Sequence, residues 1–283
     1  MSISDRAVLV ELNISVWTGQ KIDATATEKV ASDNQASHDA GKYTKNLMAG
    51  TTLRKAIADY AALCRTWHNG QTLPWHDKGA RLLPTSMFLP YKQEANSRQA
   101  YFEDLVDKFC AEYTNLVAAA SLNLGAMFDP SDYPPVDEVR TKFGFRMVFS
   151  PIPEANDFRL QVGVEDLNDL RDQYDRAYDQ RVSEAMRNTW NRLHEMLRNM
   201  SDKLTDTAEG KAKLFHGTWA NNVRDMCDLL KHLNVAGDPT LEKARLDLIN
   251  MMGNLDVDDI KSDTGVRADL KAKVDAALKQ YEW

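Results

Sequence analysis

The chain has 283 residues, of which 43% are hydrophobic and 27% are charged, a composition typical of a globular protein that buries a sizeable core. Its formal net charge of −7 argues against non-specific binding to nucleic acid or to an acidic membrane surface. No run approaches the roughly 18 apolar residues that a spanning helix needs, and no basic segment followed by an apolar run opens the chain. We therefore expect a cytoplasmic protein with no membrane contact.

The first predicted element is a β-strand at residues 8–16, in which apolar and polar side chains alternate. The apolar set is Val8, Val10, Leu12, Ile14 and Val16. A period of two predicts a strand with one buried face. Residues 20–50 are polar and rich in Ala, Thr and Ser, which predicts a weak helix or a mobile connection. A firmer helix is predicted at residues 52–67, with Thr51 or Thr52 as its cap.

Two Trp-His pairs bracket the turn-rich loop that follows. Trp67 and Trp75 are candidates for a partner contact, because Trp is enriched in interface hot spots, or for core packing. His68 and His76, with Asp77, are the best candidates for metal binding or acid–base chemistry. No third ligand lies at a suitable spacing, so no metal site is predicted.

Each cysteine lies in an apolar helical context, and the odd number argues against a disulfide framework. The cysteines are Cys64, Cys110 and Cys227. We expect free, buried thiols in a reducing compartment.

Residues 81–90 predict a short extended run, which Pro84 confines to the edge of a sheet. Residues 93–122 predict a long helix with a broad apolar face that includes Phe102 and Phe109. A Pro- and Asp-rich stretch then breaks the chain and leads to two more predicted strands. These strands are Phe143–Phe149 and Phe158–Val162.

Basic side chains surround these two strands and alternate with phenylalanines. The basic set is Arg140, Lys142, Arg146 and Arg159. If the arginines share one face, they form with the aromatic rings a stacking platform for single-stranded nucleic acid. If they are outward charges on a half-buried sheet, no binding follows. A strand pair before a long helix is similar to the core of single-strand annealing proteins, so such binding is our second hypothesis.

The chain then runs from Val164 to Leu204 without a Pro or Gly, and its apolar residues recur every three or four positions. This stripe comprises Leu167, Leu170, Tyr174, Tyr178, Val182, Met186, Trp190, Leu193, Leu197, Met200 and Leu204. An unbroken helix here would be about 60 Å long, whereas a compact chain of this size has a diameter of roughly 50 Å. We expect the helix at residues 93–122 to pack antiparallel against it. The alternative is an intersubunit coiled coil, with Tyr174, Tyr178 and Trp190 at the oligomer interface.

Shorter helices are predicted after Gly210 and form a C-terminal helical bundle. One is capped near Thr218 and runs to about Leu233, one begins at Asp238-Pro239 and ends near Gly253, and one spans about residues 267–281. The predicted domains are residues 1–209, with the sheet and long helices, and residues 210–283. An acidic cluster within the bundle lacks the spacing of a calcium loop and predicts a solvated turn. It consists of Asp256, Asp258, Asp259 and Asp263.

No motif for a reaction is present in the sequence. It has no glycine-rich phosphate loop, no nucleophile elbow and no Cys-x-x-Cys pair, and His194-Glu195 lacks the second His of a zinc-protease helix. We therefore predict no catalytic residues, no cofactor and no enzymatic activity.

The order of these features resembles a phage and proteobacterial family of uncharacterised function, often encoded near MoxR-type AAA ATPases and von Willebrand A-domain proteins. The similar parts are the strand Leu9–Trp17, the Leu83–Pro90 segment with the helix after it, and the strand Phe143–Phe149. They cover about the first two thirds of the chain. The resemblance implies a phage-encoded protein of the host cytoplasm, acting as an adaptor or as an oligomeric accessory to an AAA ATPase or host protein.

Together these patterns predict a predominantly helical α+β protein with a small antiparallel sheet, a long antiparallel helix pair and a C-terminal helical bundle. The leading functional hypothesis is a non-enzymatic, homo-oligomeric binding or assembly protein. Single-strand nucleic-acid binding is second, and a metal-dependent hydrolase centred on His68 and His76 is third.

Overall fold

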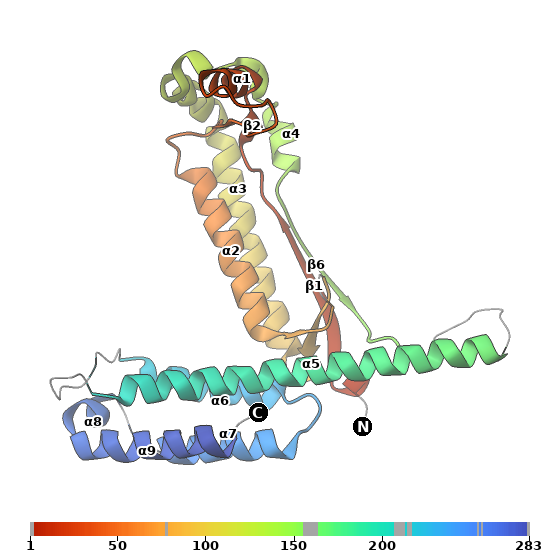
Figure 1. The fold of residues 1–283 in the computed structure, drawn as a ribbon, viewed down its shortest axis with the longest axis vertical. Helices are drawn as coiled ribbons and strands as arrows, with labels where there is room; N and C mark the ends of the chain where they lie inside the picture. Colours follow the sequence, from red (N-terminus) through yellow and green to blue (C-terminus); the bar gives the residue numbers. More distant parts are fainter. Residues whose placement is uncertain are drawn as a thin grey trace. The chain divides into compact units, whose positions relative to one another are not determined.

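Segments distant in the sequence combine into two units in the computed structural model (Figure 1). Unit 1 consists of Met1–Glu11, Asn69–Leu89 and Phe149–Trp283, and unit 2 consists of Leu12–His68 and Pro90–Val148. The structure describes residues 3–76, 79–154, 164–206, 213, 217–253, 255 and 257–281, with the backbone alone at residues 164 and 165. The predicted boundary after residue 209 lies outside the described residues, and the helices on both sides of it belong to unit 1.

A four-stranded sheet has the strand order β4-β5-β1-β6. Its strands are β1 (Ala7–Ser15), β4 (Leu73–Pro74), β5 (Arg81–Pro84) and β6 (Gly144–Ser150). Strand β5 pairs antiparallel with β1 and with β4, so that Leu82 lies opposite both Leu9 and Leu73. The extended run predicted at residues 81–90 is therefore wrong in two respects: it ends at Pro84, and it lies inside the sheet and not at its edge. The strands predicted at residues 8–16 and 143–149 are confirmed. The strand predicted at Phe158–Val162 lies outside the described residues.

Strand β1 differs from the predicted strand in having apolar contacts on both faces. Ala7 and Leu9 belong to the core of unit 1, whereas Ile14 and Val16 pack against the core of unit 2. The alternation in the sequence identifies the second set and misses the first. An interior strand of a sheet can bury side chains in both directions, which a one-faced pattern does not describe.

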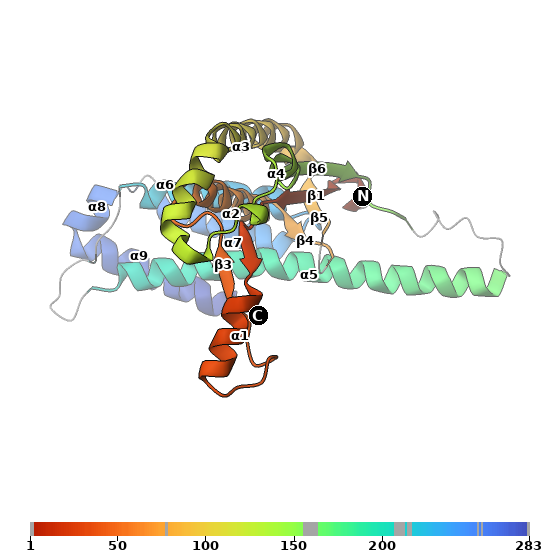
Figure 2. The ribbon, with the colours of Figure 1, turned by 90° about the horizontal axis from the view of Figure 1, so that it is seen from above.

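The long predicted helix exists as α5 (Val164–Leu204), and the second half of its apolar stripe lies in the core of unit 1. The other helices of this unit are α6 (Trp219–Leu233), α7 (Pro239–Met252), α8 (Val257–Ser262) and α9 (Thr264–Gln280). Helix α9 runs antiparallel to α5 (Figure 1): the Ser201 hydroxyl donates to the Asp275 carboxylate at 2.5 Å, and His194 Nε2 lies 2.6 Å from the Tyr281 carbonyl oxygen. In both views the first turns of α5 extend beyond α6–α9 (Figures 1 and 2).

The predicted companion of α5 is therefore wrong, because α9 takes the place expected for the helix at residues 93–122. That helix is α3 (Phe88–Leu124), and its buried face belongs to unit 2. There Phe102 and Phe109 share a core with Ile57 and Ala61 of α2 (Leu53–Gln71). Periodicity identifies an apolar face but not the helix that covers it. The α+β class, predominantly helical, is confirmed.

Trp17 lies at the centre of the unit 2 core, with ring centroids 6.2 Å from Phe109 and 6.0 Å from Tyr113. The remaining elements of this unit are β2 (Gln20–Ile22), α1 (Ala24–Asp33), β3 (Thr44–Asn46) and α4 (Val136–Thr141). Short 3-10 helices also occur along the chain, at Ile3–Asp5, Thr85–Met87, Gly125–Met127 and Pro130–Asp132. Helix α1 corresponds to the weak helix that was one of the two readings for residues 20–50, whereas strands β2 and β3 were not predicted.

The predicted starts of α2 and α7 are reproduced, but α2 runs on to Gln71, so Trp67 and His68 lie in this helix and not in a loop, and α3 begins at Phe88 and not near residue 93. Thr51 Oγ1 accepts from the Leu53 amide at 3.3 Å and begins α2, and the Asp238 carboxylate accepts from the Thr240 amide at 2.8 Å and begins α7. Gly253, with φ of 47°, follows the last residue of α7. Cys64 and Cys227 are buried and Cys110 is half-buried, and all three thiols are free. In the described ranges, no helix combines the length and apolarity needed to cross a bilayer.

Candidate partner-binding arm

Residues 20–46 form an arm in unit 2, with helix α1 carried on a two-stranded ribbon (Figure 2). Strands β2 and β3 pair antiparallel, with Gln20 opposite Asn46 and Ile22 opposite Thr44. The Asp23 carboxylate caps α1 by accepting from the Ala26 amide at 2.9 Å, and the Asp23 amide donates to the Tyr43 carbonyl at 3.0 Å. The arm is therefore an ordered element.

A buried ion-pair network fixes the base of the arm. Lys45 and Asp132 are 7% and 8% exposed, and Lys45 Nζ lies 2.5 Å from one Asp132 oxygen and 3.4 Å from Asp23. Lys45 also donates to the Met127 carbonyl at 3.1 Å, while Lys21 pairs with the second Asp132 oxygen. Asp132 is thus held between two lysines.

The pKa values of this network show that its charged forms are favoured. Burial alone would raise the pKa of Asp132, but the hydrogen bonds from Lys21 and Lys45 outweigh it and hold the pKa below its usual value. The hydrogen bond to Asp132 raises the pKa of Lys45. A lysine and an aspartate that are both ionised and both buried form a directional clamp between β3 and residues 130–132.

The tip of the arm contrasts with its base, because no side chain of α1 is buried. Ile22, Val30 and Tyr43 are 52%, 52% and 42% exposed. A ten-residue helix with three β-branched side chains is marginal in isolation, because short helices gain most of their stability by burying an apolar face. Helix α1 therefore presents an apolar face without the packing that usually stabilises one.

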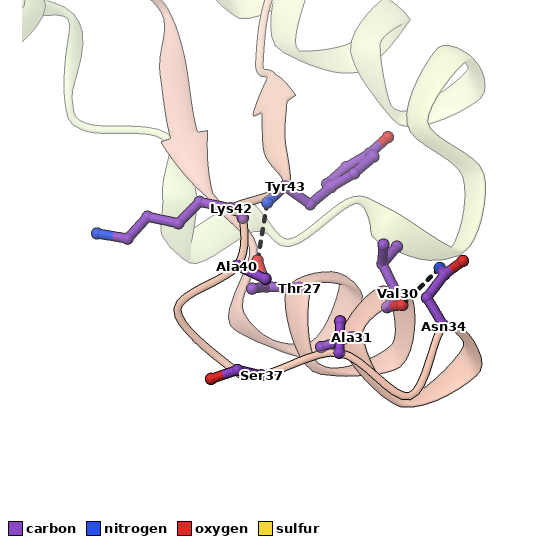
Figure 3. A pocket seen from close by; sticks show the side chains of 10 residues that line it. Thr27, Val30, Ala31, Asn34, Ser37, Ala40, Lys42 and Tyr43 are labelled. Carbon is purple, nitrogen blue, oxygen red and sulfur yellow. Dashed lines mark hydrogen bonds between the residues drawn. The ribbon is translucent and has the colours of Figure 1, made fainter.

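A hollow of about 320 Å³ lies between α1 and the segment that returns to β3 (Figure 3). Its lining is mainly aliphatic and aromatic and includes Val30, Ala31, Ala40 and Tyr43. The Thr27 hydroxyl accepts from the Tyr43 amide at 2.9 Å, and the Lys42 side chain extends away from the other residues drawn. The hollow suits an apolar side chain of a partner, and its lining lacks the acid–base pair that hydrolysis requires.

Two of the three described basic side chains predicted to bind nucleic acid are paired with carboxylates. Arg140 pairs with Asp107, and Lys142 Nζ lies 2.9 Å from Glu138. Arg146 is exposed on β6, and Arg159 lies outside the described residues. Two of the four positions are therefore neutralised by carboxylates.

The phenylalanines of the same region pack inside the chain. Ring centroids are 5.6 Å apart for Phe143 and Phe109, 5.8 Å for Phe145 and Phe102, and 5.1 Å for Phe149 and Phe88. These contacts cover part of each ring, although Phe143 and Phe145 line a hollow of about 240 Å³ together with Arg140.

The two tryptophans of the Trp-His loop have different surroundings. Trp67 is half-buried in unit 2, where it stacks on Tyr91 at 4.7 Å and lies 4.7 Å from the Arg98 guanidinium carbon. Trp75 is 3% exposed and contacts Tyr178 edge-on at 5.5 Å in unit 1. Trp75 is a core residue, whereas the Trp67 ring keeps some exposed surface.

The residues predicted at the oligomer interface already have partners within unit 1. The Tyr174 hydroxyl donates to the Pro153 carbonyl, and Tyr178 packs against Trp75. Trp190 is 3% exposed and donates from Nε1 to the Asp238 carboxylate at 3.0 Å. The core of this chain accounts for the burial of Trp190, so its ring offers no surface to a second subunit.

The histidines and the acidic cluster also have structural roles. His68 is buried with Nδ1 2.6 Å from the Tyr91 hydroxyl, His76 is exposed, and Asp77 lies outside the described residues. The acidic turn predicted at residues 256–263 includes helix α8, and Asp263 caps α9 by accepting from the Gly265 amide at 2.7 Å. Within the described ranges no group of three or more His, Cys, Asp or Glu side chains is placed to hold a metal ion.

The ribbon of the arm was not predicted from the sequence, and its helix was read only as a weak one, because α1 is short and buries no side chain. The available signals were an Asp N-cap at position 23 and the flanking Lys21 and Lys45. The chain matches no protein-family model, no curated protein and no solved structure.

Proposed function

We propose that the chain is a non-enzymatic assembly protein that forms homo-oligomers, with the arm at residues 20–46 docking on a second copy. The observation that carries this proposal is helix α1, whose side chains are all at least partly exposed although the base of the arm is held by a buried ion-pair network. The family resemblance adds an AAA ATPase or host protein as a further proposed partner.

The free energy gained by docking the arm can be compared with the binding free energy of a weak dimer. Ile22, Val30 and Tyr43 are each about half exposed, and burying the exposed half contributes roughly 1 kcal/mol per side chain. Two arms in a symmetric dimer would then contribute about 6 kcal/mol, against about 8 kcal/mol for a micromolar complex. The hollow beside α1 supplies further apolar contact, and the fixed base limits the entropy lost on docking.

Light scattering coupled to size exclusion tests the proposal directly. At about 20 µM the wild type is expected to exceed the mass of one chain, and Val30→Asp is expected to weaken association at least tenfold, because it places a carboxylate in the apolar contact. Leu246→Asp on α7 is the matched control, since Leu246 is 45% exposed outside the arm. A monomeric wild type would refute homo-oligomerisation. An oligomer that Val30→Asp leaves intact would refute the arm as its contact.

A further inference from the structure

Two hollows lie in unit 1 along helix α6, and one of them is also lined by residues of α5. One, of about 320 Å³, has Met196, Met200 and Val223 in its lining. The other, of about 390 Å³, has Met87 and Leu229 in its lining. Both hollows are lined by Asn222 and Met226, so they lie next to each other along α6, and we call the two together the α6 groove.

The floor of the α6 groove is rich in thioethers. Met200 and Met196 are 1% and 9% exposed, and Met87 and Met226 are half-buried. Methionine is flexible and polarisable, so a surface with several of them adapts to varied apolar side chains. Such a floor suits a peptide side chain better than a ligand of fixed shape.

The rim of the α6 groove is acidic. Glu195 of α5 and Asp225 and Asp228 of α6 are exposed and line its two hollows. The rim also includes His232, whose Nδ1 lies 2.8 Å from the Ser86 hydroxyl.

Among the described lining residues, Arg192 is the one permanent cation, and its guanidinium group is already engaged. It donates to the main-chain carbonyls of Asn69 at 2.8 Å, Gly70 at 2.5 Å and Thr72 at 2.7 Å. Burial and then the neighbouring Arg81 lower the pKa of Arg192 to about 10. Arg192 therefore anchors residues 69–72, and its charge also acts on Glu195, so the acidic character of the α6 groove rests mainly on Asp225 and Asp228.

We propose that the α6 groove binds a basic amphipathic helix of a partner protein. From Trp219 to His232 the groove follows 13 residue steps of α6, about 20 Å, which matches a partner helix of about 14 residues. Apolar anchors one or two turns apart enter the two hollows, and Lys or Arg side chains beside them face Glu195, Asp225 and Asp228.

The arm is not the occupant of this groove. Helix α1 carries Glu28, Lys29 and Asp33 and so has no excess of basic residues to face an acidic rim. The proposal thus concerns a second surface and does not depend on the proposed homo-oligomer. A protein whose arm is disrupted still retains the α6 groove.

The test uses a fluorescein-labelled 14-residue peptide of Leu and Lys with amphipathic spacing, titrated with the full-length protein and followed by anisotropy. The same peptide with Glu in place of Lys, and a Leu/Lys peptide of scrambled order, are the ligand controls. Wild type is expected to bind the amphipathic Lys peptide at least tenfold more tightly than either control. Equal binding of the Lys and Glu peptides, or of the ordered and scrambled ones, would overturn the proposal.

A charge-reversal pair locates the binding. Asp225→Lys with Asp228→Lys is expected to weaken binding about tenfold, whereas Asp172→Lys with Asp175→Lys, which makes the same net-charge change on exposed positions of α5, leaves it unchanged. Equal weakening by both pairs would mean non-specific attraction and would reject the groove. Circular dichroism checks that both double variants are folded. Met226→Glu is expected to abolish peptide binding without altering the oligomeric mass. That result would separate this test from the test of the arm.

Discussion

Replacing Asp132 with Asn removes one charge from the clamp at the base of the arm while nearly conserving the shape of the side chain. Lys45 then keeps only Asp23, at 3.4 Å, and the Met127 carbonyl as partners. Breaking a buried ion pair typically costs 3–5 kcal/mol, and the residual contact with Asp23 places this variant at the lower end, about 3 kcal/mol. Urea unfolding at pH 7, followed by tryptophan fluorescence and circular dichroism, measures the difference.

The exposed pair Lys273–Asp269 provides the control, because its side chains are 53% and 67% exposed. Asp269→Asn is expected to change the free energy of unfolding by less than about 0.5 kcal/mol. In the double variant Lys45→Met, Asp132→Leu, apolar groups replace both charges, which is expected to restore more than half of the loss. If Asp132→Asn is no more destabilising than Asp269→Asn, the clamp does not hold the arm.

The acid dependence of stability gives an independent check on the same clamp. The pKa of Asp132 is lower in the folded than in the unfolded state. The contribution of Asp132 to the free energy of unfolding is therefore fully present above the unfolded-state pKa of about 4, and it is lost as pH falls through the folded-state pKa. The difference between wild type and Asp132→Asn is therefore expected to shrink as pH falls below 4. The pKa of Lys45 is raised, so its contribution to the free energy of unfolding is fully present up to about pH 10.5 and does not change in this acidic range.

Three further outcomes follow from contacts described above or from backbone geometry. Burial raises the pKa of the Cys227 thiol to about 11, so Cys227 should stay unreactive to Ellman's reagent at pH 8 until the protein is unfolded in urea. Gly50→Ala should destabilise the protein by about 1–2 kcal/mol in urea unfolding, because φ is +80° and the new Cβ would meet the Asn123 amide nitrogen at 2.6 Å, whereas Gly41→Ala, with open space, should be near neutral. Arg192→Leu should lower the free energy of unfolding by about 2–3 kcal/mol, since it deprives buried main-chain carbonyls of their donor; a thermal midpoint equal to that of wild type would contradict this reading.

The elements that could be predicted from the sequence are those with local physical markers. An Asp-Pro start and a Gly stop mark α7, a threonine cap marks α2, and an unbroken apolar period marks α5. The packing of these elements could not be predicted in the same way. The stripes of α3 and α5 look alike in the sequence, and nothing local reveals that one is covered by α2 and the other by α9.

The candidate sites were largely invisible in the sequence for two reasons. Arg140 read as an unpaired base because Asp107, its partner, is 33 residues away, so only the fold brings these two charges together, whereas the partner of Lys142 is the local Glu138. The arm was read only as a weak helix or a mobile connection, because α1 buries no side chain and so carries only a short apolar pattern. The α6 groove likewise combines residues from α5, α6 and the segment before α3.

The division of the chain into interleaved segments has a consequence for biosynthesis. All residues of unit 2 have been translated once the ribosome has passed Val148, whereas unit 1 needs both the first eleven residues and the last helices. Unit 2, which includes the second half of β1, is thus expected to fold on the nascent chain before α5 has been translated, whereas Ala7 and Leu9 gain their core contacts in unit 1 later. Deletion of either terminus should therefore damage unit 1 and leave unit 2 as the surviving fragment.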